Sequence, residues 1–351
     1  MTDAVHVVAV GARTPLGLRA APAAAAVRAG ISALRRHPFL VDRAGDLMPA
    51  ALDSSLDPRA LSSGRLSELL ESAIREACAL LGGTVGTLPR ALPLCVGLPE
   101  LRPGFGERDV AAVRAGLGRI DDLPVAFSNV DMFVRGHAAG ILALARAVEI
   151  IRHEMAPMCL VAGVDSYFQP DTLEWLDANR QIVGSISRSA FVPGEGAGCC
   201  LLMSERASDR YGIKPLLRVV EVGVGYEAKL IKTSDMCLGE GLTATVGQAV
   251  QGLHLPDQRI NQIICDINGE RYRGEEWGFV CLRLGRCFDN PAAYLSPADC
   301  WGDMGAASGP LFVMLACEAR TRGYAKGPRT LAWAGSESGC RAAALLADAA
   351  S

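Results

Sequence analysis

The stretch Val134–Ile151, VRGHAAGILALARAVEII, begins with a polar turn and continues into a helix of small and aliphatic residues. Glycine and alanine at the start of a helix allow its backbone to approach another backbone closely. A helix N-terminus carries partial positive charge and unpaired N–H groups, which stabilise an anion such as a thiolate. The residue at this position is His137, and an imidazole suits the position less well than a thiolate. The stretch therefore predicts a buried, closely packed helix with an unusual residue at its mouth.

The elements around this helix occur twice along the chain. The first copy has a strand at 5–10 with a loop at 11–17, the helix at 136–151, and strands at 159–166 and 196–205; the second has a strand at 260–267 with a loop at 268–274, a helix at 302–320, and strands at 330–338 and 339–348. Continuous apolar strands of this kind are typical of a sheet covered on both faces. Four successive elements agree in order and character, which indicates an internally duplicated α/β fold.

The two copies divide the chain into two fused halves, 1–205 and 206–351, that meet near 206–216. The first half is the longer one because of an insertion at about 20–125. The insertion contains a helix at 62–82 with apolar residues at helical spacing, a serine cap at its start and glycines at its end. No low-complexity linker separates the halves, so we expect one globular unit.

Composition places the chain in the soluble globular class. Half of the 351 residues are hydrophobic and the net charge is only -3, which favours neither nucleic acid nor a membrane surface as a partner. No basic region precedes the apolar run at the start, and no uncharged apolar stretch approaches the roughly 18 residues that span a bilayer. These features predict a cytoplasmic protein. The twelve cysteines include no Cys-x-x-Cys pair, which favours reduced, buried thiols over disulfides or structural zinc.

Four motifs resemble those of the β-ketoacyl synthases of the thiolase superfamily. They are HVVAVGARTPLG at 6–17, FVPGEGAGCCLL at 191–202, GLTATVGQAVQGLHLPDQRINQIICDING at 241–269, and GDMGAASG at 302–309, a shortened form of Gly-His-x-x-Gly-Ala-Ala-Gly. The resemblance covers essentially the whole chain in the family's order. It implies a duplicated thiolase-like fold in five layers (αβαβα), a homodimer, and a Cys-His-His triad that condenses acyl and malonyl thioesters.

The triad positions carry other residues in this chain. A cysteine thiolate takes the acyl group, and two histidines stabilise the negative charge that develops after decarboxylation. The resemblance puts the nucleophile position at His137, or at Ala138 with a one-residue slip. It puts Glu270 at the first histidine and Asp303, or Gly302, at the second. All five histidines of the chain precede Asn268, so neither C-terminal histidine exists under any alignment.

Loss of the triad predicts a catalytically silent ketosynthase-like protein that acts as a dimeric scaffold or partner subunit. Its partner is expected to be an acyl carrier protein or an accessory subunit, and no cofactor is expected. An acyltransferase or acyl-thioester-binding protein with non-standard residues is the alternative. A third hypothesis is a new site in which His137, Glu270 and Asp303 meet in one cleft, as a salt-bridged remnant or as part of a divalent metal site. The sequence leaves open whether an acyl tunnel survives.

Overall fold

A computed structural model describes residues 3–349 apart from 58, 61, 84–87, 231, 232 and 234. Its elements form two similar series. The first is β1 (Val5–Arg13), α2 (Ser62–Cys78), β4 (Ala91–Leu98), α3 (Glu107–Leu117), β5 (Ala126–Val134), α4 (Ala139–Arg152), β6 (Met158–Ser166) and β7 (Glu195–Ser204). The second is β8 (Leu217–Tyr226), α7 (Glu240–Val250), β9 (Gln262–Cys265), α8 (Arg271–Leu284), β10 (Tyr294–Leu295), α10 (Ser308–Thr321), β11 (Arg329–Gly335) and β12 (Cys340–Ala347).

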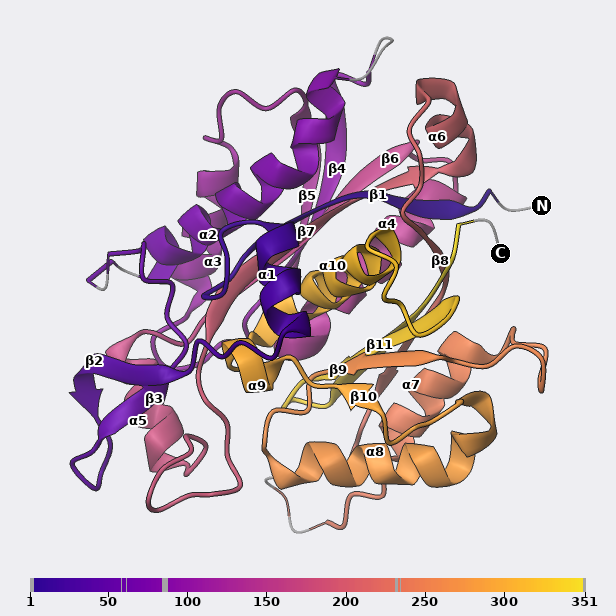
Figure 1. Ribbon diagram of the computed structural model, residues 1–351. Coiled ribbons are helices and arrows are strands. Elements are labelled where there is room, and N and C mark those ends of the chain that lie inside the picture. Colours follow the sequence, from indigo (N-terminus) through magenta and orange to yellow (C-terminus); the bar gives the residue numbers. More distant parts are fainter. Residues whose placement is uncertain are drawn as a thin grey trace.

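The long strands form one mixed sheet in the order β10-β9-β11-β12-β8-β1-β7-β6-β4-β5. β1 and β8 pair antiparallel at the middle of this order. Reading outward from that pair gives the same arrangement on both sides, which relates β1 to β8, β4 to β9 and β6 to β11 (Figure 1). The duplication expected from the sequence is therefore present in the sheet.

The sheet order corrects two details of the predicted duplication. The strand at 5–10 corresponds to β8, whereas the strand at 260–267 corresponds to β4. Charged residues and glycines interrupt the apolar run of β8, Leu217–Tyr226. For this reason the sequence pattern did not predict the strand. The predicted insertion at 20–125 is too long, because α2, β4 and α3 have counterparts in the second half. The division at 205 and 206, which falls at the start of α6 (Glu205–Tyr211), stays a prediction.

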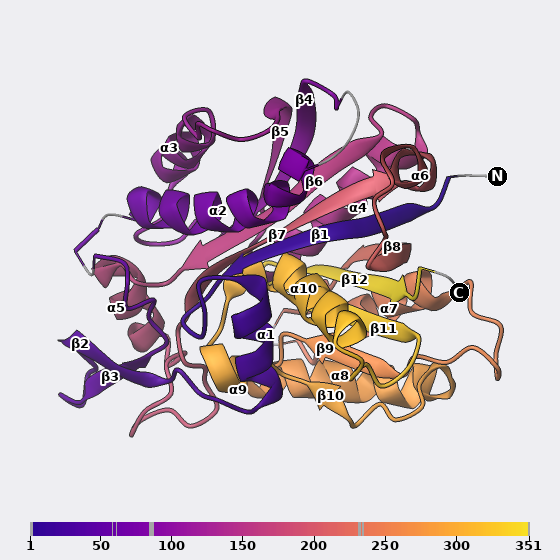
Figure 2. The same cartoon turned by 45° about the horizontal axis from the view of Figure 1, so that its top comes forward.

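The helices and the two halves of the sheet form five layers. α2 and α3 cover the outer face of one half, α7 and α8 cover the outer face of the other, and α4 and α10 lie between them (Figure 2). Three apolar clusters fill the spaces: one surrounds α4 and α10, one lies under α2, and one lies under α7 and α8. The αβαβα architecture predicted from the resemblance is confirmed.

The remaining elements lie outside these two series. Besides α6 and short 3-10 turns, they include α1 (Ala20–Arg28), which packs on α10, the hairpin β2 (Arg35–Val41) and β3 (Leu47–Ala50), and the short helices α5 (Pro170–Ala178) and α9 (Ala298–Trp301). The hairpin and α5 enclose a small apolar cluster of their own. All twelve cysteines are free. Within the described ranges, no helix is long and apolar enough to cross a membrane.

Glycines allow α4 and α10 to approach each other closely. A Cβ atom on Gly140 of α4 would lie 2.4 Å from Pro310 Cδ, and one on Gly309 of α10 would lie 2.6 Å from the amide nitrogen of Ile141. Neither position has space for a side chain unless the helices separate. The small residues at the start of each helix therefore hold the N-termini of α4 and α10 together, and with them the loops that precede both helices.

We expect Gly140→Ala to lower the free energy of unfolding by about 1–3 kcal/mol, because the new methyl group forces two packed helices apart. Gly247→Ala in α7 is the matched control, since nothing lies within 4 Å of its added Cβ. That control should be neutral or should stabilise by up to about 1 kcal/mol through helix propensity. Urea denaturation measures both variants, and equal stability of the two would contradict the close helix contact.

Candidate functional site

The loops before α4, α8 and α10 bring the three predicted site residues together. His137 lies in the 3-10 turn Gly136–Ala138, where Gly136 has a φ of +64°. Asp303 precedes the 3-10 turn Gly305–Ala307, which packs against the turn of His137. Glu270 is the N-cap residue of α8. The close packing of α4 and α10 thus places His137 and Asp303 in one buried site.

Asp303 is the centre of this site. Nε2 of His137 lies 2.9 Å from each of its carboxylate oxygens. Tyr167 Oη donates to Oδ1 at 2.9 Å, the amide of Gly305 donates to the same oxygen at 2.8 Å, and Asn268 Nδ2 donates to Oδ2. Although burial opposes the charged form, His137 and Arg273 hold the pKa of Asp303 well below its ordinary value. Asp303 is therefore an ionised carboxylate surrounded by donors.

Arg273 joins Glu270 to this site. Its Nε donates to Glu270 Oε2 at 3.1 Å, its Nη1 donates to Asp266 Oδ2 at 2.6 Å, and its Nη2 lies 3.2 Å from His137 Nε2. The guanidinium is almost fully buried. The expectation that His137, Glu270 and Asp303 meet in one place is met, with Arg273 and Asn268 as the bridging side chains.

The contact with Asp303 favours the protonated form of His137. Burial alone would lower its pKa, but the contact with Asp303 outweighs burial, and the net effect raises the pKa above 6.5. A protonated Nε2 donates to Asp303, so its 3.2 Å approach to Arg273 Nη2 brings two donors together. Asp303, which binds His137, and Glu270 and Asp266, which bind Arg273, offset this contact. The imidazolium has no free electron pair on this nitrogen and is a poor nucleophile.

We expect His137 to keep its proton at higher pH than the other buried histidines. Burial lowers the pKa of His6 and of His37 below 6.5, while Asp303 raises that of His137. The stabilisation from the His137–Asp303 pair should be complete below the unfolded-state pKa of about 6.5 and should be lost as the pH rises through the folded-state pKa. An NMR titration of the imidazole signals measures the order of the three pKa values. A pKa for His137 lower than that for His6 would contradict the prediction.

A small cavity borders His137. Its volume is about 60 Å³, and its lining includes Arg102, Asp165, Tyr167, Trp175 and Phe191. The backbone amide of Ala138, which an oxyanion at the helix mouth would need, already donates to Ser336 Oγ at 2.9 Å. Both the space and the donors at the mouth of α4 are therefore largely occupied by the protein's own groups.

The sequence and the fold are similar to those of known proteins. Residues 136–208, from the turn of His137 into α6, match the family model "Beta-ketoacyl synthase, N-terminal domain". A ketosynthase structure, that of a type II PKS acyl-carrier protein in complex with its ketosynthase bound to the hexaketide, superposes with a TM-score of 0.80 at 14% identity, over 99% of this chain and 100% of that one. The chain has the ketosynthase fold. The resemblance inferred from the four motifs is thereby confirmed at the level of the fold.

Two further structures share the ketosynthase fold with this chain. The ishigamide ketosynthase/chain length factor has a TM-score of 0.79 at 17% identity, over 99% of this chain and 100% of that one. The ketosynthase from module 6 of the bacillaene synthase from Bacillus subtilis 168 has a TM-score of 0.79 at 14% identity, over 99% of this chain and 72% of that one. No protein with a curated description matches the sequence significantly.

The metal hypothesis for this ketosynthase-fold site does not agree with the geometry. The Glu270 carboxylate accepts from Arg273, Asn268 and Gln181, so it is turned toward donors of its own. Across the described ranges, no group of three or more His, Cys, Asp or Glu side chains is arranged to hold a metal ion. The salt-bridged arrangement of the third hypothesis is the one observed.

Sequence reasoning missed the residues that neutralise the site. Arg273 and Tyr167 bind the predicted carboxylates directly, and Arg102 donates to Asp165 Oδ1 at 2.6 Å behind them. One signal was available: Glu270 and Arg273 are three residues apart at a helix start, where side chains share a face. No comparable signal marked Arg102, which lies in a loop far away in sequence.

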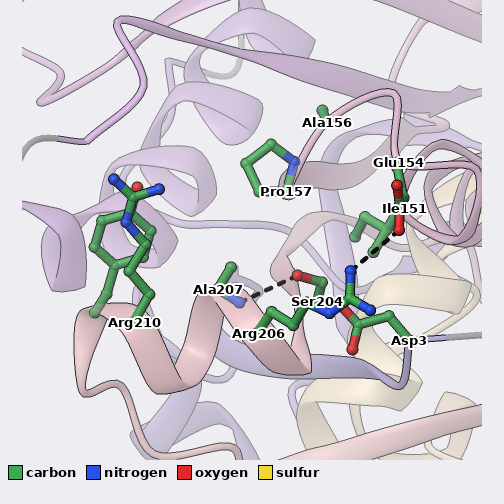
Figure 3. Close-up of a pocket in the computed structure, with 10 residues that line it drawn as sticks. Asp3, Ile151, Glu154, Ala156, Pro157, Ser204, Arg206, Ala207 and Arg210 are labelled. Carbon is green, nitrogen blue, oxygen red and sulfur yellow. Dashed lines mark hydrogen bonds and ion pairs between the residues drawn. The ribbon is translucent and has the colours of Figure 1, made fainter.

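A second cavity, of about 230 Å³, lies where α6 meets the ends of β7 and α4 (Figure 3). Arg206 spans it with ion pairs to Asp3 at 3.8 Å and Glu154 at 3.2 Å. None of the predicted site residues lines this cavity. It is larger than the cavity beside His137 and is separate from the site of His137 and Asp303.

Proposed function

We propose that this protein is a catalytically silent subunit with the ketosynthase fold that acts as a scaffold or partner in a dimeric assembly. The ion pair between His137 and Asp303 is the observation that carries the proposal. In the β-ketoacyl synthases that the motifs resemble, the mouth of this helix holds a thiolate and the facing loops hold histidines. Here a cation and a carboxylate neutralise each other at those positions.

The pair removes the chemistry that a condensing enzyme needs. A nucleophile must offer an electron pair to the thioester carbon, and the protonated His137 Nε2 offers none while it donates to Asp303. The histidine donors that would stabilise developing negative charge are replaced by Glu270 and Asp303, and buried carboxylates repel such charge. Condensation and simple acyl transfer are both disfavoured by this exchange.

The small volume of the cavity beside His137 also supports a catalytically silent protein. The cavity of about 60 Å³ beside His137 is far below the roughly 300–1,000 Å³ of typical small-molecule sites. Tyr167, Phe191 and Leu176 are buried and line it, so an acyl chain would have to displace core side chains. This disfavours the alternative of an acyl-thioester-binding protein.

The structures that share this fold suggest the kind of partner. One similar structure contains an acyl carrier protein in complex with its ketosynthase, and another is a ketosynthase/chain length factor. We therefore propose an acyl carrier protein or an accessory subunit as the partner. Purification from the native host tests this: a stoichiometric protein partner is expected, whereas co-purified acyl-CoA without a protein partner would favour the acyl-thioester-binding alternative.

We also expect this chain to form a homodimer through β5. This strand lies at one end of the sheet and pairs only with β4 among the described strands. Its outer edge therefore offers N–H and C=O groups to a second copy, and two-fold symmetric pairing is the commonest oligomer type. Light scattering at micromolar concentration should give twice the chain mass. Ser128→Lys, at an exposed position of β5, should weaken the dimer, and a monomeric native protein would refute the prediction.

A further inference from the structure

Two cavities meet at the first residues of β2, where Arg35 and Arg36 line both of them. One cavity has a volume of about 240 Å³ and reaches Arg65 of α2. The other has a volume of about 410 Å³ and reaches the loop at 183–184. No residue that lines the cavity beside His137 lines either of them. Because they share two residues, the two cavities form one groove with the arginines in its middle.

The charges of the groove are unbalanced. Arg65 and Asp53 also line it, but each is paired with a buried group of opposite charge. Arg35 is exposed, and its side chain makes no hydrogen bond or ion pair with any residue that the structure describes. Arg36 is also exposed, and its guanidinium donates only to the backbone carbonyl of Leu47, at 2.7 Å. The groove therefore offers two cations without counter-charges.

One carboxylate lies at the edge of the groove. A Cβ atom on Gly184, which lines the larger cavity, would lie 3.2 Å from Asp42 Oδ2. Asp42 itself lines neither cavity, and its Oδ1 accepts from the backbone amides of Ala44 and Asp46. One carboxylate at the edge does not balance two arginines, so the groove keeps a net positive charge.

Apolar groups make up most of the remaining lining. They are Pro15, Ala33, Pro38, Leu52 and Leu56 in the smaller cavity, and Leu34, Pro49 and Val183 in the larger one. The same hairpin exposes Phe39 and the cross-strand pair Val41 and Leu47. Exposed apolar surface beside unpaired charge is typical of a site that binds another protein.

We propose that this groove binds an extended acidic segment of a partner protein. A carboxylate of the segment accepts from Arg35 and Arg36, and an apolar side chain enters the cavity on each side. Alternate side chains of an extended chain lie on one face, so an acidic residue with apolar residues two positions before and after it has the required pattern. The inference rests on the proposed function, since a partner subunit needs a surface for its partner.

Other occupants fit the groove less well. A free inorganic anion would pair with the arginines but leave the apolar lining exposed to water. A bilayer surface has no side chains to place in two concave cavities. A second copy of this chain is expected at β5, and Figures 1 and 2 show the hairpin of β2 and β3 away from that strand. The groove thus stays open in the expected homodimer.

The peptide acetyl-Leu-Ser-Glu-Ser-Leu-amide tests the proposal, titrated against the native protein while NMR follows the backbone amide signals of Leu34, Val183 and Gly184. We expect saturable shifts. Replacing the peptide's glutamate with glutamine, or both of its leucines with serine, should weaken binding at least about fivefold. No saturable shift, or equal affinity for the glutamine peptide, would overturn the proposal.

Variants of the protein test the two arginines. Arg35→Gln combined with Arg36→Gln should weaken binding of the glutamate peptide by about 5- to 30-fold, because two charged contacts are lost. Arg90→Gln combined with Arg108→Gln is the matched control, since both positions are exposed, line neither cavity and change the net charge equally. Equal effects of the two pairs would show that the peptide responds only to net charge, which would overturn the proposal.

Two further probes identify other occupants. Inorganic phosphate that shifts the same amide signals at lower concentration than the peptide would assign the groove to small anions and overturn the proposal. Sedimentation with phosphatidylcholine vesicles that contain about 20% phosphatidylserine, if the Arg35 and Arg36 variant abolishes it and the peptide does not bind, would also overturn it. These titrations involve no catalysis, so their failure leaves the proposed silence intact. Acylation of His137 alongside normal peptide binding would overturn the proposed function instead.

Discussion

Asp303→Asn is expected to lower the free energy of unfolding by about 3–5 kcal/mol, because it leaves buried cations without their counter-charge. Asp303 is 3% exposed and accepts hydrogen bonds from His137, Tyr167, Asn268 and Gly305. An asparagine at this position presents an NH₂ group to donors and removes the charge that holds the His137 proton. Chemical denaturation at neutral pH measures the effect.

Two further variants make this result specific. Asp257→Asn removes a carboxylate from an exposed loop position and should change stability by less than about 0.5 kcal/mol. The double variant His137→Gln with Asp303→Asn removes both charges, so it should be more stable than the sum of the two single effects predicts. A loss below about 1 kcal/mol for Asp303→Asn would show that the pair contributes little to the folded state.

The scaffold of the site was predictable from the sequence for a physical reason. Glycine and alanine at the starts of the helices at 136–151 and 302–320 predict that the two backbones lie close together. In the structure, Gly140 of the first helix packs against Pro310 of the second. Duplication then brings the loops before those helices to one centre, which is where His137 and Asp303 meet. Small residues at the helix starts and the internal repeat were enough to predict that these two loops meet, because the position of the loops depends on the backbone.

The rest of the site depends on side-chain packing, which leaves little trace in a single sequence. Arg273 unites Glu270, Asp266 and His137 only because its guanidinium turns inward at the start of α8. The size of the cavity depends on the side chains that line it, among them Trp175 and Leu176 of α5 and the aromatic rings of Tyr167 and Phe191. Strand β8 escaped prediction since its alternating, half-buried residues do not form a continuous apolar run.

The second large effect concerns catalysis. We expect ketosynthase activity at least about 10⁴-fold below that of an intact member of the fold, because all three triad positions have been replaced and such residues act as one unit. His137→Cys should not restore activity. The introduced thiol would face the Asp303 carboxylate, which raises a thiol pKa, and would still lack an acyl tunnel and both histidines. Product formation from acyl and malonyl thioesters measures both proteins.

Mass spectrometry of the intact native protein after incubation with an acyl thioester tests the central claim most directly, with an active ketosynthase as the positive control. The silent-subunit account predicts that the mass stays unchanged while the control gains one acyl group. A mass increase of one acyl group that maps to the peptide 134–152, which contains His137, would contradict it.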